Sequence, residues 1–247
     1  MSEGLWSDMF HQSTKLLHLE EGAQSDGCDA PIAWPMAHFK SYPRFDQIAL
    51  DRVPSSSGLS VEDAITNRRS RRDFTGEPIS LGELSKILFY STGITYRNRT
   101  WDDSRRAYPS AGAGYPLESY PVVLRVRNVD RGIYHHDVKR NTLELMRGGD
   151  FSSRIVQCTG QEWVRAASVV LVVSAVFGRT IAKYGDRGYR YVFLDAGHMV
   201  QNTYLVAVSM NLGCCTIGGF LDHEMDTMLE LDGRDESVVY IAAIGRC

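Results

Sequence analysis

The sequence lacks several patterns that would each point to a common class of protein. Its five cysteines form no Cys-x-x-Cys pair, so we expect no zinc site. No uninterrupted apolar run reaches the roughly 18 residues that a membrane span needs. Neither sign of charge dominates, because 27 basic residues face 30 acidic ones. This balance gives no reason to expect nucleic acid or an anionic membrane as a partner.

The cysteine count also bears on the compartment. An odd number of cysteines without a secretory leader favours a reducing, cytoplasmic setting. No internal repeat is found in the 247 residues, which are enough for one large domain with a substantial core.

Residues 1–57 are expected to form an N-terminal arm that packs on the main domain, residues 58–247. Ser, Gly and Asp are scattered through this arm, and its prolines interrupt helices, so it is predicted to be irregular. Residues 53–58 are the best candidate linker. Four large apolar side chains of the arm need cover from the body: Trp6, Phe10, Trp34 and Phe39.

The main domain shows helix and strand patterns that do not alternate regularly. Ser60 begins a short helix, and Ser80 and Glu83 form a capping box for a second helix that ends near Ser91. This irregular order favours an α+β fold over a doubly wound sheet. Further along we expect a loop over 97–118, a strand over 120–129, a hairpin over 132–145, a buried central strand over 167–177, a long apolar helix over 189–212 and a final buried strand over 237–244.

Four arginines and a serine follow the first helix, as Arg68, Arg69, Ser70, Arg71 and Arg72. A guanidinium presents a rigid set of donors that matches phosphate oxygens. Because the chain as a whole is slightly acidic, this run predicts a local anion site. A solvated charged turn and a short basic localisation signal are the alternatives.

The stretch 108–118 is rich in small residues. The backbone at Gly112 could approach a flat ring closely, and Ser110 adds a hydrogen-bond donor. Gly112 and Gly114 do not make a dinucleotide fingerprint, because no third glycine follows and Tyr115 and Pro116 do not begin a helix. An ordinary glycine-rich turn is the alternative.

Lys183 and Tyr184 stand between the buried strand and the long helix. A partly buried lysine can hold a neighbouring tyrosine in its reactive form, so the pair could do acid–base chemistry. On composition alone, a surface loop with solvated cations is the simpler interpretation.

Two further groups of polar residues are interpreted as structural. Asp195, His198 and Asn202 share one face of the long helix, and we favour a satisfied network at a helix or subunit interface over metal ligation. The run from His135 to Asp137 is expected at a hairpin turn, facing solvent.

Gly218, Gly219 and Arg246 are the last candidates. The paired glycines offer free backbone N–H groups to a ligand, and Arg246 could reach the same phosphate as the arginine run. A helix-to-strand turn is the alternative for the glycines.

Together these motifs resemble the nitroreductase-like flavoproteins, and most closely the SagB-type dehydrogenases, also called thiazole/oxazole or azoline oxidases. The resemblance covers about residues 60–247. The arginine run matches the broad family, whereas the stretches beginning at Pro109, Lys183 and Ala196 match the narrower branch. Two departures are visible: Gly114 stands where a larger apolar residue is usual, and Asp195 where Glu is usual.

The resemblance implies a central, mostly antiparallel sheet flanked by helices, and a homodimer with a long interface helix and FMN at the interface. Ser110 and Gly112 would approach the isoalloxazine from the partner subunit, and Lys183 and Tyr184 match the catalytic pair. The remaining implied FMN contacts are Arg68, Arg69, Ser70 and Arg72 at the phosphate and ribityl chain, with Gly218, Gly219 and Arg246 closing the site.

The implied activity is oxidation of a thiazoline or oxazoline ring to the aromatic azole, in a ribosomal peptide or on a carrier protein. Tyr184 would take the proton, with Lys183 as a nearby positive charge, while flavin takes the hydride and passes electrons to oxygen. Two other functions stay open. One is an NAD(P)H-dependent reductase of nitro compounds or quinones, and the other is a non-catalytic scaffold in a biosynthetic complex.

Overall fold

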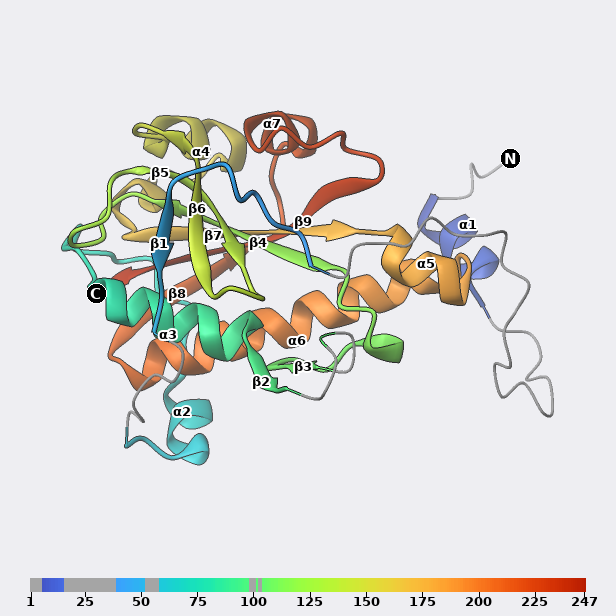
Figure 1. Ribbon diagram of the computed structural model, residues 1–247, viewed down its shortest axis with the longest axis horizontal. Helices are drawn as coiled ribbons and strands as arrows, with labels where there is room; N and C mark the ends of the chain where they lie inside the picture. The colour runs from blue at the N-terminus through green and yellow to red at the C-terminus, as the bar shows by residue number, and fades with distance from the viewer. Residues whose placement is uncertain (1–5, 16–38, 52–57, 98–100, 102–103) are drawn as a thin grey trace.

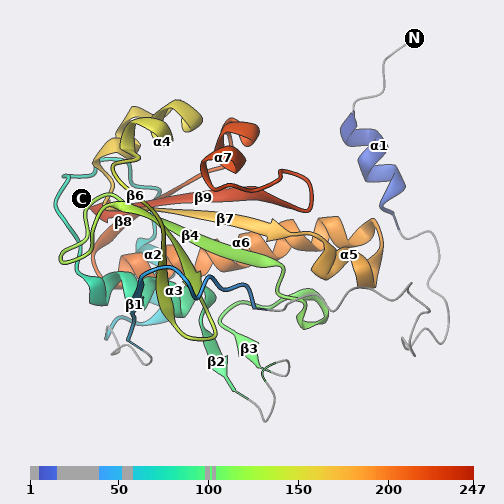
Figure 2. The same cartoon turned by 45° about the horizontal axis from the view of Figure 1, so that its top comes forward.

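A seven-stranded sheet forms the centre of the molecule, with helices on both faces (Figures 1 and 2). The computed structural model describes residues 6–15, 39–51, 58–97, 101 and 104–247. The strand order is β1-β6-β5-β4-β7-β9-β8, and every neighbouring pair is antiparallel. The strands are β1 (Gln47–Ala49), β4 (Leu117–Val123), β5 (Gly132–Asp137), β6 (Thr142–Gly148), β7 (Val169–Val176), β8 (Leu212–Ile217) and β9 (Glu236–Arg246), with β2 (Ile94–Tyr96) and β3 (Arg105–Arg106) in a separate pair. The predicted α+β class and antiparallel sheet are confirmed.

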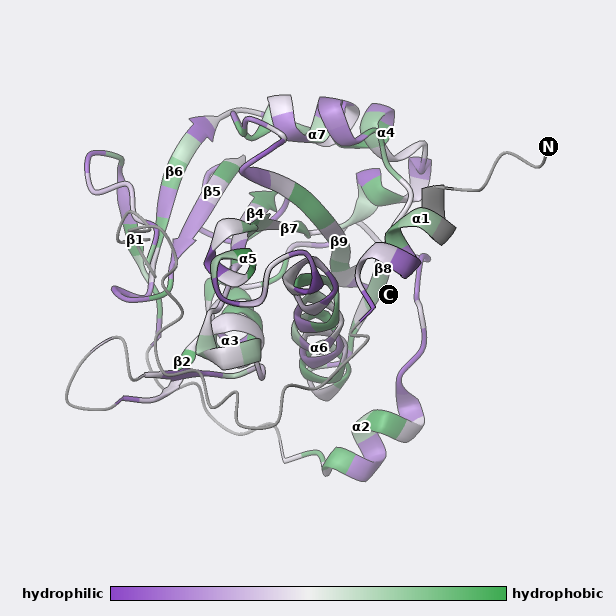
Figure 3. Cartoon of the chain, turned by 90° about the vertical axis from the view of Figure 1, so that its right-hand side faces the viewer, coloured by the Kyte–Doolittle hydropathy of each residue, from purple (hydrophilic) through white to green (hydrophobic). Residues whose placement is uncertain are grey.

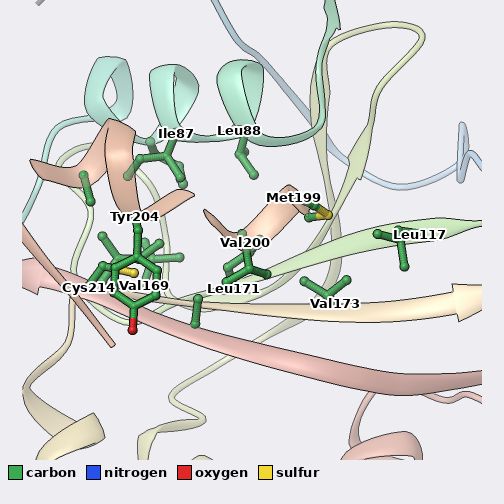
Figure 4. Close-up of a cluster of buried hydrophobic side chains, with 14 of the residues drawn as sticks. Ile87, Leu88, Leu117, Val169, Leu171, Val173, Met199, Val200, Tyr204 and Cys214 are labelled. Atoms are coloured by element: carbon green, nitrogen blue, oxygen red, sulfur yellow. The ribbon is translucent and has the colours of Figure 1, made fainter. Parts of the chain in front are cut away.

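Helices α3 and α6 cover one face of the sheet, and Figure 3 shows α6 nearly end-on beside α3. Their contact with the sheet is apolar. Figure 4 shows Ile87 and Leu88 of α3 and Val200 of α6 gathered over Leu171 and Val173 of β7. Full burial of such a side chain contributes about 1.5–3 kcal/mol each. The helices are α1 (Trp6–Ser13), α2 (Val61–Asn67), α3 (Leu81–Thr92), α4 (Ser152–Thr159), α5 (Gly178–Tyr184), α6 (Arg187–Ser209) and α7 (Asp222–Met228), with 3-10 turns η1 (Ala111–Ala113) and η2 (Glu162–Ala166).

The other face of the sheet is divided. Helices α4 and α7 and the turn η2 cover a second apolar cluster, which contains Val170 and Val172 of β7. Toward the other end of β4 and β5, the same face carries buried charged side chains, which residues 39–42 cover. Because both faces of β7 are covered, its unbroken β-branched run is explained.

Several predicted elements are confirmed. Ser60 caps α2 by accepting the N–H of Asp63, and Ser80 and Glu83 form the capping box of α3. The long helix, the central strand and the final strand appear as α6, β7 and β9, with ends shifted by a few residues.

Other boundaries were wrong. The strand predicted over 120–129 ends at Val123, because the N–H groups of Leu124 and Arg125 both turn to the C=O of Ser168. The expected loop 97–118 contains the short strand β3 and the turn η1. Lys183 and Tyr184 lie on helix α5 rather than on a loop.

The described part of the arm includes a helix, α1, where an irregular chain was expected. Arg190 of α6 donates hydrogen bonds to Thr14 Oγ1 and to the C=O of His11, and the Phe10 and Tyr189 rings lie 5.3 Å apart. The candidate linker at 53–58 lies, apart from its last residue, outside the described residues, so the domain division stays a prediction. Within the described chain, no helix is both long and apolar enough to cross a membrane.

Candidate functional site

The arginine run leaves α2 and passes along the edge strand β8. Arg68 ends the helix, and its backbone N–H bonds to the C=O of Ala64. The N–H of Arg71 then donates to the C=O of Cys214 at 3.0 Å, and Ser70 forms a parallel bridge with Cys214. Strand β8 therefore fixes the run in place.

Tyr204 of α6 gathers two members of the run. The Arg68 guanidinium carbon lies 5.2 Å from the centre of the Tyr204 ring, within cation–π range. Ser70 Oγ and Tyr204 Oη are 3.0 Å apart, and Tyr204 Oη also accepts the N–H of Thr216 at 2.9 Å. Tyr204 was not found from the sequence, because a tyrosine on an apolar helix face is typical of an ordinary core residue.

The positive charge of the run is only partly neutralised. Arg71 pairs with Asp73 at 2.6 Å. Within the described residues, no carboxylate lies at ion-pair distance from Arg68, Arg69 or Arg72. These three guanidiniums are therefore available to bind an anion.

The other residues predicted for this site lie around it. Arg72 is 5.9 Å from the ring of the tryptophan in η2. Gly218 and Gly219 come directly after β8 and are exposed. Arg246 lies at the end of β9, where it forms an ion pair of 2.6 Å with Glu83. Arg246 is thus already engaged in an ion pair, unlike Arg68, Arg69 and Arg72.

Lys183 and Tyr184 form a second cluster, together with Gly112. A Cβ built on Gly112 would lie 2.5 Å from Tyr184 Oη and 3.0 Å from Lys183 Nζ, so both terminal atoms converge on this point. Gly112 has a φ of +57°, a left-handed conformation that glycine adopts at least cost. Both the space and the backbone conformation therefore explain the glycine.

One chain does not bring the two clusters together. Helix α5 packs on the first turn of α6, where a Cβ on Gly188 would lie 2.9 Å from the C=O oxygen of Thr180. Tyr204 lies near the other end of α6, about 24 Å farther along at the usual helical rise. Figure 1 shows α5 at one end of α6 and the start of β8 at the other.

His135 is buried, and the prediction of a solvent-facing turn was wrong for the whole run from His135 to Asp137. These residues lie on β5 between β4 and β6, and the turn follows them. His135 Nδ1 is 2.9 Å from Glu144 Oε2, and its Nε2 is 3.1 Å from Glu118 Oε2. Burial alone lowers the pKa of His135, but the hydrogen bonds to the two glutamates more than offset this effect and raise the pKa.

Glu118 extends this buried chain of charges to α5. Its carboxylate pairs with Arg179 at 2.6 Å, and both side chains are almost fully buried. Burial alone raises the pKa of Glu118, but the hydrogen bond from His135 and the charge of Arg179 outweigh it and hold the pKa at about 2. The helix that carries Lys183 is therefore tied to the sheet by charge.

The arginine run fits the phosphate of FMN. The guanidiniums of Arg68 and Arg69 would hold it, because within the described residues no carboxylate lies at ion-pair distance from either. Nothing comparable exists for a metal ion within the described chain, where no group of three or more His, Cys, Asp or Glu side chains could hold one.

The chain belongs to the nitroreductase family, whose sequence pattern matches residues 65–246. A Methanocaldococcus jannaschii protein named as a nitroreductase is 36% identical over 183 residues, which cover 73% of this chain and 89% of that protein. The Escherichia coli microcin B17-processing protein McbC is 29% identical over 224 residues, which cover 86% of this chain and 80% of McbC.

Solved structures give the same fold. A nitroreductase from Anabaena variabilis superposes with a TM-score of 0.75 at 26% identity, over 96% of this chain but only 46% of the Anabaena chain. The E. coli microcin synthetase McbBCD complex, with truncated pro-MccB17 bound, has a TM-score of 0.63 at 24% identity and covers 98% of this chain and 92% of that one. A Desulfovibrio desulfuricans nitroreductase solved with FMN has a TM-score of 0.52 at 21% identity, over 76% and 86% of the two chains.

Proposed function

We propose that this protein is an FMN-dependent azoline oxidase, which converts thiazoline or oxazoline rings to thiazole or oxazole in peptide natural-product biosynthesis. The observation that carries the proposal is the convergence of Lys183 Nζ and Tyr184 Oη on the space beside Gly112. Family membership supports the flavin, and the likeness to McbC supports a peptide substrate.

The protein's own part in the reaction is positioning and proton transfer. Tyr184 takes the proton from ring carbon as a general base, and the neighbouring Lys183 ammonium stabilises the phenolate by its charge. When bound, FMN would supply the acceptor for the hydride. Gly112 lets the backbone come close to both side chains, since a Cβ there would lie 2.5 Å from Tyr184 Oη.

The site is built from two copies of the chain. Arg68 and Tyr184 lie at opposite ends of α6, so a flavin held by the arginine run of one protomer would meet the Lys183–Tyr184 pair of the other. A closed two-fold dimer would make two such sites. The E. coli complex supports a further proposal, that this dimer works with other biosynthetic proteins on a peptide or on a carrier-bound thiazoline.

Turnover of a synthetic thiazoline peptide by the FMN-loaded protein tests this function. We expect azole formation, detected by mass spectrometry as the loss of two hydrogens. Removing a general base costs roughly 100-fold or more in rate, so Tyr184→Phe should lose most activity and keep FMN. Tyr96→Phe, an exposed tyrosine on β2, is the matched control. Full activity in Tyr184→Phe and Lys183→Ala would overturn the assignment.

The likeness to the M. jannaschii protein favours a second candidate, an NAD(P)H-dependent nitro or quinone reductase. Rapid bleaching of the flavin band by NADPH, without azole formation, would support this candidate. A folded dimer that binds no flavin would instead support the scaffold function.

A further inference from the structure

The loop 110–115 adopts a strained backbone beside the Lys183–Tyr184 pair. Gly112 has a φ of +57°, and two residues that are not glycine also have positive φ, Ala113 at +55° and Tyr115 at +44°. Left-handed conformations are costly for residues other than glycine and persist only where neighbouring groups hold them. The contacts that hold this loop therefore control where Gly112 lies.

Helix α6 supplies several of those contacts, and Arg179 of α5 adds one by donating to the C=O of Tyr115 at 3.2 Å. The hydroxyl of Ser110 donates to Asp195 Oδ2 at 2.6 Å, and Asp195 also accepts the N–H of Ala111. Seven residues farther along the same helix, Asn202 Nδ2 donates to the C=O of Ala107 at 2.9 Å. Two polar side chains of α6 thus hold the loop and the segment that leads into it.

Ser110 also closes the loop from within. Its Oγ accepts the N–H of Tyr115 at 2.9 Å while its proton is directed to Asp195. A hydroxyl has one donor, and here that donor is used within the protein. Ser110 therefore acts on the shape of the loop, which differs from the direct flavin contact expected by resemblance.

The Asp195 carboxylate is 4% exposed and no ion pair is formed with it within the described residues. Burial raises the pKa of Asp195, and the bonds from Ser110 and the Ala111 N–H oppose that rise. A buried carboxylate is costly unless donors satisfy it, and the donors here belong to the loop. The loop and the carboxylate thus depend on each other.

We propose that Asp195 is a positioning residue for the reaction: with Ser110 it clamps the loop 110–115 onto α6 and so holds Gly112 against Lys183 and Tyr184. This inference rests on the proposed function for its catalytic consequence, but not for the clamp itself. Asn202 supports the clamp at the segment that precedes the loop. The polar face of α6 thereby acquires a role in the site.

Hydrogen–deuterium exchange of the flavin-free protein tests the clamp without activity. Asp195→Ala should speed exchange in residues 110–115 by roughly 10- to 100-fold, the usual effect of losing a hydrogen bond to a charged group. Ser110→Ala should give a similar increase in the exchange rate. The double variant should exchange little faster than either single variant, since both substitutions remove the same Ser110–Asp195 hydrogen bond. Asp195→Asn, which keeps an acceptor oxygen, should restore most of the protection.

Ser85→Ala is the matched control, because it also removes a buried hydroxyl, one that donates to the C=O of Asp51 far along the chain from the loop. It should leave exchange in 110–115 unchanged. In the FMN-loaded enzyme, Asp195→Ala and Ser110→Ala should both lower kcat by about tenfold or more, with FMN content and KM for the thiazoline peptide unchanged. A general loss of folded protein would lower FMN content as well.

Unchanged exchange in folded Asp195→Ala, or fully additive effects of the two substitutions, would refute the clamp. If Asp195→Ala does not fold, Ser110→Ala and Asp195→Asn carry the same test. Loss of FMN in Ser110→Ala alone would indicate that Ser110 contacts the flavin directly, and this too would refute the proposal. If the variants show the expected changes in exchange but the wild-type protein forms no azole, the proposed function is refuted and the clamp still holds.

Discussion

Replacing His135 with glutamine should destabilise the protein strongly, because His135 connects two buried carboxylates. The imidazole is fully buried, and its two nitrogens lie 3.1 Å and 2.9 Å from Glu118 and Glu144. A glutamine amide has donors on one nitrogen only, so it can satisfy one carboxylate but not both. The other carboxylate is then left buried with one hydrogen-bond donor fewer.

The magnitude follows from the burial. Removing one partner of a buried ion pair costs about 3–5 kcal/mol, because a charge stays buried without compensation. For a chain of this length each kcal/mol lowers Tm by about 2–4 °C, so His135→Gln should lower Tm by about 6–20 °C. The control is His223→Gln, an exposed histidine on α7, which should leave Tm within about 2 °C of wild type.

The same residue predicts a pH dependence. Since the folded-state pKa of His135 is raised, its stabilisation is fully present below the unfolded value near 6.5 and is lost as pH rises through the folded value. Glu118, with a pKa of about 2, contributes stability that is fully present above its unfolded value and is lost as the pH falls from that value through about 2. Thermal melts from pH 5 to pH 9 should therefore show a decline in wild type that His135→Gln lacks. Equal Tm values, or parallel pH profiles, would refute this account of the charge chain.

Three further predictions concern the site and the thiols. Gly112→Ala should lower kcat sharply, because its Cβ would displace the flexible ends of Tyr184 and Lys183, while costing only about 1–2 kcal/mol in stability. Steady-state kinetics measures kcat and a thermal melt measures stability; an unchanged kcat would contradict the prediction. Tyr204→Phe should weaken FMN binding by roughly tenfold through the lost bonds to Ser70 and Thr216, measured by flavin fluorescence, and unchanged affinity would contradict it. Of the four described cysteines, Cys247 should be alkylated first, because it is exposed whereas Cys158, Cys214 and Cys215 are buried. Peptide mass spectrometry would show a different order if this is wrong.

Local patterns predicted the parts of the fold that depend on neighbouring residues. Ser60 and Ser80 identified helix starts because an N-cap acts over three residues, and the β-branched run of β7 is a local signal of burial. Gly112 was predicted to let the backbone approach a flat ring closely, and this stays a prediction; the sequence could not show that Tyr184 and Lys183 lie beside it.

The errors arose where distant residues decide the outcome. His135 and His136 have the composition of a polar turn, but Glu118 and Glu144, on two other strands, make the burial of His135 tolerable. The interpretation of Asp195 as part of a satisfied network agrees with its bond to Ser110, but that partner lies 85 residues away and could not be named from the sequence. The length of α6 was predicted, but which motif sits at which end follows only from packing.

Subunit complementation tests the central claim most directly. An Arg68→Ala/Arg69→Ala variant and a Tyr184→Phe variant, each inactive alone, are mixed under conditions that exchange subunits and assayed on a thiazoline peptide with FMN. If each site takes arginines from one protomer and Tyr184 from the other, random pairing restores about one quarter of wild-type activity, since half of the sites in mixed dimers carry neither substitution. Activity no greater than the sum of the two separate variants would contradict a site shared between two copies of this chain.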